Sequence, residues 1–304
     1  MAEAPHRAGF AAIVGRPNVG KSTLLNRLLG HKLAIVSPKP QTTRSRILGV
    51  VTRPDAQVAL LDTPGLHAAR GGLNARMVQQ ALHTLADADV ALLLIEAGPP
   101  RIDPAMRQAL EQVAAARKPT VLVINKIDAI PRRELLPLID RWKGEHPWTD
   151  VYPLSALTGE NVDGLLDAVA RHLPEGPALF PADVWTDVPE RDLSAELIRE
   201  QILRQTEQEV PYSAAVLIEE FDESERDVGP RGLVRITATV LVERDSQKAI
   251  VIGKGGARLK EIGTKARGQI EKLLGCKVFM QLHVRVEKDW TRTSRGLRRA
   301  GYTE

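Results

Sequence analysis

The sequence predicts two domains, a doubly wound α/β domain followed by a smaller α+β domain. Three observations support this. The 304 residues are enough for about two domains. The first half alternates apolar strands with amphipathic helices, a pattern typical of a covered parallel sheet. Residues 174–189 contain four prolines and little periodicity, which indicates a linker. We therefore expect domains at 1–175 and 193–304, joined by a linker at 176–192.

Apolar runs and helical spacing give the elements of the first half in order. Continuous apolar runs are typical of strands buried on both faces of a sheet. The expected strands are 10–14, 57–61, 90–96, 120–125 and 151–154. Leucine and other apolar residues repeat at helical spacing between them, and the expected helices are 22–29, 103–117 and 162–173. Gly30 is the candidate C-cap of the first helix.

The second half has a different order of elements. An amphipathic helix at 193–208 precedes two strand-like stretches separated by a polar turn at 222–231. A glycine-rich turn then opens a long helix. The remaining expected elements are strands 214–221, 233–242 and 277–287 and helices 257–274 and 290–299. This order predicts an α+β domain with no internal repeat of the first half.

Composition excludes several classes of protein. The apolar fraction of 43% and the charged fraction of 26% are those of a soluble globular protein. No run of about 18 apolar residues is present, and residues 1–8 lack the apolar core of a signal peptide. The single Cys276 excludes an internal disulfide, and we expect it to be half-buried in a strand and inert.

Charge is concentrated at the C-terminal end. From Lys248 onward 14 Lys and Arg stand against five Asp and Glu, a net charge of +9, which leaves −5 for residues 1–247. A basic end on a near-neutral body indicates a polyanionic partner. The alternative, a solvated charged face, stays open from charge alone.

Four blocks in the first half each follow an expected strand. They are Gly15-Arg16-Pro17-Asn18-Val19-Gly20-Lys21-Ser22, Asp62-Thr63-Pro64-Gly65, Asn125-Lys126-Ile127-Asp128 and Ser155-Ala156. Ligands of such sheets bind beyond the carboxyl ends of the strands. Each block alone is compatible with an ordinary turn, and the first alone with an ATPase. Together, in this order and spacing, they indicate a guanine-nucleotide site.

The first two blocks suit phosphates and Mg²⁺. Backbone N–H groups of a glycine-rich loop close around phosphate oxygens, and Lys21 reaches the β- and γ-phosphates. The Ser22 hydroxyl faces Mg²⁺, Asp62 holds it through a water, and the Gly65 N–H touches the γ-phosphate. The full set expected at the nucleotide is Gly15, Arg16, Pro17, Asn18, Val19, Gly20, Lys21, Ser22, Thr23, Asp62, Gly65, Asn125, Lys126, Asp128, Ser155 and Ala156.

The last two blocks select the base. The Asp128 carboxylate can accept hydrogen bonds from guanine N1–H and the exocyclic amine, a donor pair that adenine lacks. Lys126 can lie over the purine, and Asn125 can tie the base site to the phosphate loop. The Ala156 N–H can donate to the guanine carbonyl oxygen. We expect Asp128 to be partly buried, so that a wrong base leaves it unpaired.

Hydrolysis is expected to be slow. Leu66 follows the second block and cannot orient an attacking water as a glutamine does. In the segment 40–44 a threonine hydroxyl could close on Mg²⁺ and the γ-phosphate, and we favour Thr43 over Thr42. Asn18 could ligate a monovalent cation such as K⁺, or make an ordinary turn bond. The candidate catalytic residues are Lys21, Thr43, Gly65 and Asn18, and the candidate Mg²⁺ ligands are Ser22, Thr43 and Asp62.

These blocks, with Pro40-Gln41-Thr42-Thr43-Arg44, closely resemble the Era family of bacterial GTPases. In the second half, Pro211-Tyr212-Ser213, Leu241-Val242-Glu243-Arg244, Gln247-Lys248 and Ile252-Gly253-Lys254-Gly255-Gly256 look like its KH domain. The resemblance implies a Ras-like P-loop NTPase domain, a type II KH domain, and binding to small-subunit ribosomal RNA near its 3′ end during subunit assembly. It also implies a K⁺ role for Asn18 and a peripheral contact at the inner face of the cell membrane.

The residues support RNA binding independently of the resemblance. A Gly-x-x-Gly loop clamps the backbone of about four nucleotides in KH domains, and Gly253 opens such a loop before a helix. Aromatic residues are only 4% of the chain, which disfavours a base-stacking platform. The expected RNA-binding residues are Gly253, Lys254, Gly255, Gly256, Arg258 and Lys260. Arg292, Arg295, Arg298 and Arg299 are further candidates, with a solvated basic helix as the alternative reading.

The leading hypothesis is a monomeric, cytoplasmic GTP-hydrolysing switch that couples its nucleotide state to RNA on the immature small ribosomal subunit. Two alternatives belong to other classes of protein. One is an RNA chaperone in which the nucleotide only stabilises the fold. The other is a membrane-surface scaffold that uses the basic end.

Overall fold

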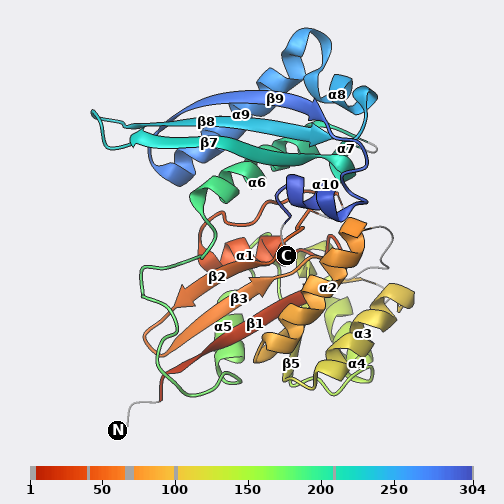
Figure 1. The fold of residues 1–304 in the computed structure, drawn as a ribbon. Helices are drawn as coiled ribbons and strands as arrows, with labels where there is room; N and C mark the ends of the chain where they lie inside the picture. Colours follow the sequence, from red (N-terminus) through yellow and green to blue (C-terminus); the bar gives the residue numbers. More distant parts are fainter. Residues whose placement is uncertain (1–4, 40–41, 66–71, 99–101, 208–209, 303–304) are drawn as a thin grey trace. The chain divides into compact units, whose positions relative to one another are not determined.

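The computed structural model describes residues 5–39, 42–65, 72–98, 102–207 and 210–302. It divides into two compact units, of which the N-terminal one extends to Asp187 and the C-terminal one begins at Val188 (Figure 1). Both units have the predicted fold class, an α/β unit followed by an α+β unit.

The N-terminal unit is built on a six-stranded sheet in the order β2-β3-β1-β4-β5-β6. Its strands are β1 (Arg7–Gly15), β2 (Ile47–Thr52), β3 (Ala56–Asp62), β4 (Val90–Glu96), β5 (Thr120–Asn125) and β6 (Asp150–Pro153). All pairs are parallel except β2 with β3, which is antiparallel. The four motif blocks follow β1, β3, β5 and β6, so they gather along one edge of the sheet.

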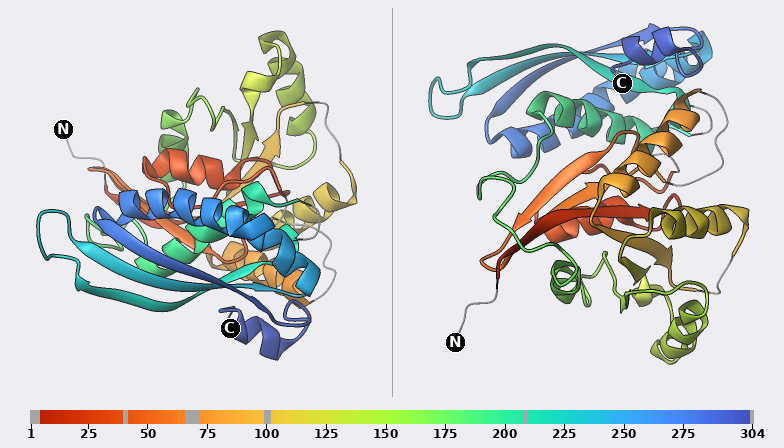
Figure 2. Two further views of the ribbon diagram at one scale, coloured as in Figure 1. Left: turned by 90° about the horizontal axis from the view of Figure 1, so that it is seen from above. Right: turned by 60° about the horizontal axis from the view of Figure 1, so that its bottom comes forward.

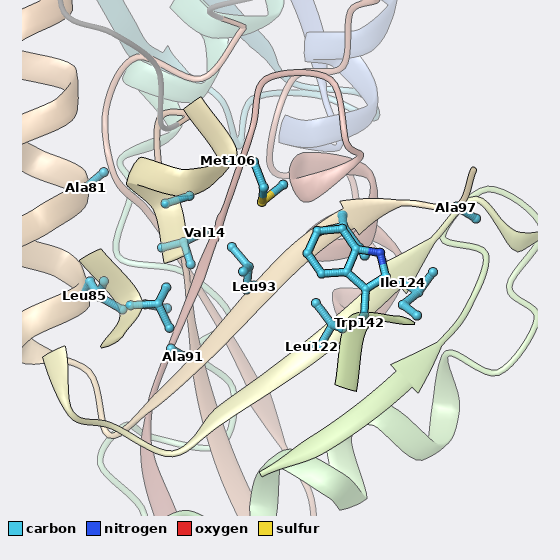
Figure 3. Close-up of a cluster of buried hydrophobic side chains, with 14 of the residues drawn as sticks. Val14, Ala81, Leu85, Ala91, Leu93, Ala97, Met106, Leu122, Ile124 and Trp142 are labelled. Carbon is cyan, nitrogen blue, oxygen red and sulfur yellow. The ribbon is translucent and has the colours of Figure 1, made fainter. Parts of the chain in front are cut away.

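Helices cover both faces of this sheet (Figures 1 and 2). The elements are α1 (Lys21–Leu29), α2 (Gly72–Asp87), α3 (Pro104–Ala116), α4 (Leu135–Lys143), α5 (Asp163–Ala170) and the short 3₁₀ helices η1 (Ile127–Ala129) and η2 (Arg132–Glu134). Helices α2, α3 and α4 pack on β1, β4 and β5 through one buried apolar cluster, which includes Leu85, Met106 and Trp142 (Figure 3). Helices α1 and α5 pack against β1 and β3.

Besides the two 3₁₀ helices, three elements of this unit were given no bounds by the sequence. They are strand β2, in which the consecutive residues 47–50 are all buried, and helices α2 and α4, each of which buries one face. Met77, Ala81 and Leu85 recur every four residues and place one side of α2 on the sheet. The helix begins at Gly72, and residues 66–71 before it lie outside the described residues.

Residues 175–187, most of the expected linker, lie against β2 and β3, and we call this segment the strap. The side chain of Gln57, fully buried in β3, accepts from the N–H groups of Leu179 and Phe180 and donates to the Phe180 carbonyl at 2.7–2.8 Å. Further along, Val50 N–H donates to the Trp185 carbonyl at 2.9 Å. The strap therefore gives the outer edge of β2 backbone partners that an edge strand would otherwise lack.

The C-terminal unit is a three-stranded sheet with helices on one face. Its elements are α6 (Glu190–Gln205), α7 (Val210–Ser213), β7 (Ala215–Glu225), β8 (Leu233–Val242), α8 (Asp245–Ile252), η3 (Lys254–Gly256), α9 (Ala257–Leu274), β9 (Lys277–Val286) and α10 (Ser294–Arg299). Strand β8 pairs antiparallel with β7 and parallel with β9. Helices α6 and α9 pack on each other and on the sheet (Figure 2).

Local capping explains where this unit differs from expectation. Helix α8 was missed; it starts after Arg244, and the Gln247 side-chain oxygen accepts from the backbone N–H groups of Glu243 at 2.9 Å and Arg244 at 3.2 Å, without the usual Ser or Thr cap. Helix α10 begins at Ser294 and not at the expected Trp290, because the Thr293 side chain accepts from the Gly296 N–H at 3.0 Å. Strand β7 continues to Glu225 through two register shifts, so the polar turn is shorter than expected.

Two features are absent from the described residues. None of their helices is both long and apolar enough to cross a membrane. No group of three or more His, Cys, Asp or Glu side chains among them could hold a metal ion.

Candidate functional site

The phosphate loop, residues 15–20, has a backbone that requires its glycines. Gly20 has φ of 99°, and a Cβ there would lie 2.2 Å from the Asn125 amide nitrogen. Only glycine therefore lets the loop pass so close to the block that follows β5. Helix α1 begins at Lys21, directly after the loop, so the N-terminus of the helix points toward the phosphate loop.

Lys21 is buried beneath this loop, with only 6% of its surface exposed. Its ammonium donates to the carbonyls of Gly15 at 3.1 Å and Arg16 at 2.9 Å. Burial lowers the pKa of Lys21 to about 8, against the opposing attraction of the Asp62 carboxylate. A buried cation with few fixed partners suits a polyanionic ligand.

Three oxygen-bearing side chains converge next to Lys21. The Ser22 hydroxyl donates to Asp62 Oδ2 at 2.8 Å, and Thr43 Oγ1 lies 2.9 Å from Ser22 Oγ and 3.3 Å from Asp62 Oδ2. Asp62 is fully buried, burial raises its pKa, and its Oδ1 has no hydrogen-bond partner among the described residues. A buried carboxylate oxygen with two hydroxyls beside it is the donor set that Mg²⁺ prefers, so the residues present fit this ion.

Residues 37–39 and 42–43 lie beside the phosphate loop. Asn18, at φ of 65°, donates from its amide nitrogen to the Pro38 carbonyl at 2.7 Å. Thr42 donates to the Lys39 carbonyl at 2.7 Å, whereas Thr43 belongs to the group around Asp62. These segments, with Gly65 and Lys126, line a cleft of about 360 Å³.

The base-selecting blocks meet on the other side of the phosphate loop. Asn125, at the end of β5, donates to the Val19 carbonyl at 2.8 Å and accepts from the Ala156 N–H at 2.9 Å. Its side chain thus joins the phosphate loop to the Ser155-Ala156 block. Lys126, at φ of 66°, pairs with Glu96 at 3.0 Å, a partner that the motif alone does not predict.

Asp128 differs from expectation. It lies on η1 and is exposed, whereas we expected it to be partly buried. Selection for guanine would then depend on the two hydrogen bonds that this carboxylate accepts, and less on the cost of leaving it unpaired.

Two other residues of the phosphate region need comment. The Arg16 guanidinium pairs with Asp103, the N-cap of α3, at 2.9 Å, so its part in a nucleotide site is that of its backbone. Leu66, on which we based the expectation of slow hydrolysis, lies outside the described residues.

In the C-terminal unit, the Gly-x-x-Gly turn joins α8 to α9. Gly253, Gly255 and Gly256 have φ of 71°, 59° and 79°, so three of the four residues adopt backbone angles that favour glycine. Lys254 and Lys260 are exposed. Arg258 differs from these two lysines. Its guanidinium donates to the Ile250 carbonyl at 2.5 Å and so links α9 to α8.

The basic C-terminal helix α10 presents exposed arginines. Arg299 pairs with Glu287 at 2.8 Å and Arg292 with Asp289 at 3.6 Å.

Cys276 is half-buried as expected, but it lies in the bend before β9 and not in a strand, and burial raises its thiol pKa. A raised pKa keeps the thiol protonated and supports the expectation that it is inert.

Comparison with protein families identifies both units. A family model described as a 50S ribosome-binding GTPase matches residues 10–126, and a KH domain model matches residues 209–291. The chain is 50% identical over 303 residues to the GTPase Era of Geobacter metallireducens, with 100% of each chain covered. It is 49% identical over 298 residues to the GTPase Era of Syntrophus aciditrophicus, covering 98% of this chain and 96% of that one.

Two solved structures are similar over nearly the whole chain. Era in complex with MgGDPNP and nucleotides 1506–1542 of 16S ribosomal RNA has a TM-score of 0.92 and 44% identity, covering 98% of this chain and 100% of that one. A variant of Aquifex aeolicus Era bound to GDP and AlF₄⁻ has a TM-score of 0.93 and 43% identity, with the same coverage.

Proposed function

The chain belongs to the Era family of GTPases, and from that premise we propose that it hydrolyses GTP and binds the 3′ region of small-subunit ribosomal RNA. The observation that carries the proposal is the convergence of Lys21, Asp62 and Asn125 at one sheet edge, in a chain that also carries an exposed Gly-x-x-Gly turn. The first arrangement suits a guanine nucleotide, and the second suits a nucleic-acid backbone.

The side chains divide the work of nucleotide binding. The Lys21 ammonium and the loop N–H groups hold the β- and γ-phosphates, while Asp128 holds the base. The Ala156 N–H, which we expected to meet the guanine carbonyl oxygen, donates to Asn125 instead. Ser22, Thr43 and Asp62 would hold Mg²⁺, which neutralises charge on the phosphate oxygens when bound. The contacts of Thr43 with Ser22 and Asp62 support Thr43 over Thr42 in this role. The Gly65 N–H stabilises the γ-phosphate.

Hydrolysis needs charge stabilisation and a positioned water. We assign the first to Lys21 and the backbone N–H groups, which stabilise the charge that develops on the transferred phosphoryl group.

The Asn18 amide nitrogen donates to the Pro38 carbonyl, and the Asn18 side-chain oxygen has no hydrogen bond to a described residue, which supports the K⁺ role for that oxygen. Replacing K⁺ by Na⁺ should then slow hydrolysis, and Asn18→Ala should abolish the difference between the two ions.

RNA binding is assigned to the turn at 253–256 and the exposed Lys260. The glycines let the RNA backbone approach closely, and the first turn of α9 offers N–H groups to a phosphate. The net charge of +9 from Lys248 onward suits the small ribosomal subunit as partner. The same charge suits the second candidate partner, an anionic membrane surface at the inner face of the cell membrane.

Single-turnover hydrolysis with and without an RNA matching the 3′ end of small-subunit ribosomal RNA tests the proposal. We expect slow release of γ-phosphate that depends on Mg²⁺, together with RNA binding that Lys254→Glu weakens. Bound GTP that is never cleaved under either condition would favour an RNA chaperone. Lipid-vesicle binding that disappears along with RNA binding in Lys254→Glu would show one surface serving both partners.

A further inference from the structure

Arg27 lies on the outer side of the loop that meets the guanine base. It belongs to α1, the helix that begins with the phosphate-binding Lys21 and Ser22. Its Nε donates to the Ala156 carbonyl at 3.2 Å, and a terminal nitrogen donates to the Leu157 carbonyl at 2.5 Å. One guanidinium thus holds two successive carbonyls of a loop 129 residues further along the chain.

The loop 155–160 is a closed turn. Ser155 N–H donates to the Glu160 carbonyl and Gly159 N–H to the Ser155 carbonyl, both at 2.9 Å. The Ser155 hydroxyl accepts from the Thr158 N–H at 3.1 Å. These bonds fix the inside of the turn, whereas the carbonyls of 156 and 157 are held from outside by Arg27. The internal hydrogen bonds therefore fix the conformation of the loop, and Arg27 fixes its position relative to α1.

Two features show that this contact is built into the fold. Gly159 has φ of 91°, and a Cβ there would lie 3.6 Å from the nearest nitrogen of the Arg27 guanidinium, so this group lies beside Gly159. Among the described residues no carboxylate pairs with Arg27, so the two carbonyls are its partners. A planar guanidinium suits two parallel acceptors, and a lysine ammonium in its place would not reach both with the same geometry.

Resting on the proposed function, we propose that Arg27 is a positioning residue for guanine recognition. Asn125 links the phosphate loop to the Ala156 N–H from inside the site, and Arg27 links the phosphate-binding helix to the Ala156 carbonyl from outside. The two links together set the position of Ala156, and of the loop that continues from it, relative to the phosphate loop and α1. Without Arg27 the loop is held at one side only.

The variant Arg27→Ala tests this, with the exposed Arg107→Ala on α3 as matched control. Equilibrium competition should use GDP and inorganic tripolyphosphate, which offers phosphates but no base. We expect Arg27→Ala to weaken GDP binding by roughly three- to tenfold, the scale of one or two hydrogen bonds, and to leave tripolyphosphate binding within about twofold. Arg107→Ala should leave both affinities unchanged.

Equal losses for both ligands would overturn the proposal, because Arg27 would then act through α1 and the phosphates. No loss for either would overturn it too. If Arg27→Ala does not fold, Arg27→Lys removes the two-pronged contact while keeping the charge, and the same pair of ligands decides. A wild-type chain that does not bind GDP at all would reject the proposed function itself, whereas wild-type binding with an unaffected variant rejects only the role of Arg27.

Discussion

The two candidate binding sites of this chain are built in opposite ways. At the nucleotide site three functional side chains are buried and hydrogen-bonded to neighbouring residues: Lys21, Asp62 and Asn125 are 6%, 0% and 2% exposed. At the Gly-x-x-Gly turn the functional groups are exposed, and the shape comes from the backbone angles of three glycines. The first site is defined by side-chain chemistry and the second by backbone geometry.

This difference determines which ligands each site can distinguish. A buried charge has a high desolvation cost, so the ligand must supply the complementary charge at the right atom. An exposed glycine turn with a lysine at its tip contributes charge and close approach, which favour any accessible phosphate backbone. Substitutions in the first site should therefore have large, ligand-specific effects, and those in the second smaller effects that depend on salt.

The largest expected effect comes from Lys21→Ala. Removing the buried ammonium should slow GTP hydrolysis by about 100- to 1000-fold, as the loss of a main charge-stabilising donor does. RNA affinity should stay within about twofold of wild type, because the turn at 253–256 does not use this group. Single-turnover phosphate release and RNA fluorescence polarisation measure the two. Lys143→Ala, which removes an exposed lysine paired with Asp140, is the control. An equal loss of RNA affinity would contradict the separation of the two sites.

A second effect, on base preference, is expected from Asp128→Asn. The amide reverses part of the donor and acceptor pattern, so GDP affinity should fall about 100-fold while xanthosine diphosphate gains, on the scale of two charge-assisted hydrogen bonds. Competition between the two diphosphates measures the change, with Asp140→Asn on α4 as control. An unchanged preference for guanine would show that the exposed Asp128 does not select the base.

A smaller effect is expected at the turn. Lys254→Glu should weaken RNA binding about tenfold and reduce the slope of log affinity against log salt by about one. Titrations at several salt concentrations measure both quantities. Lys272→Glu makes the same charge change in the last turn of α9, away from the turn, and should have less effect. GTP hydrolysis should be unaltered by either change, and a large drop there would break the comparison.

The smallest expected effect is the dependence of nucleotide affinity on pH. The Lys21 ammonium carries its charge below its pKa of about 8 and loses it above. Affinity for GDP should therefore be full near pH 7, fall about twofold at pH 8 and about tenfold at pH 9, provided that the bound phosphates keep the ammonium charged. Calorimetric titrations across this range measure it. Lys21→Ala should remove the decline, and a flat profile in the wild type would contradict the buried-ammonium account.

The sequence predicted the fold class and the motif-bearing elements because their signals are local. Strand β8 and helix α9 have the expected bounds, since alternation and helical spacing are strong there. The block after β5 also suggested a tie between base site and phosphate loop, and the structure contains a bond from Asn125 to Val19.

What escaped prediction depends on contacts between distant segments. Nothing in the sequence around Arg27 indicates that its guanidinium meets carbonyls of the loop after β6, and nothing around Glu96 indicates its pairing with Lys126. The exposure of Asp128 depends on how η1 leaves the sheet. The strap was expected to be a linker because its prolines give no periodicity, and its hydrogen bonds go to a side chain more than 100 residues away.

The strap also determines where the chain can be cut. A fragment that stopped at Glu175 would remove three of the four hydrogen-bond partners of the Gln57 carboxamide and uncover the Val50 N–H. Each buried polar group left in this way costs about 1–3 kcal/mol. A truncation at Asp187 keeps these bonds, so it is the end point at which an isolated GTP-binding fragment should express as a stable protein for spectroscopy or ligand screening.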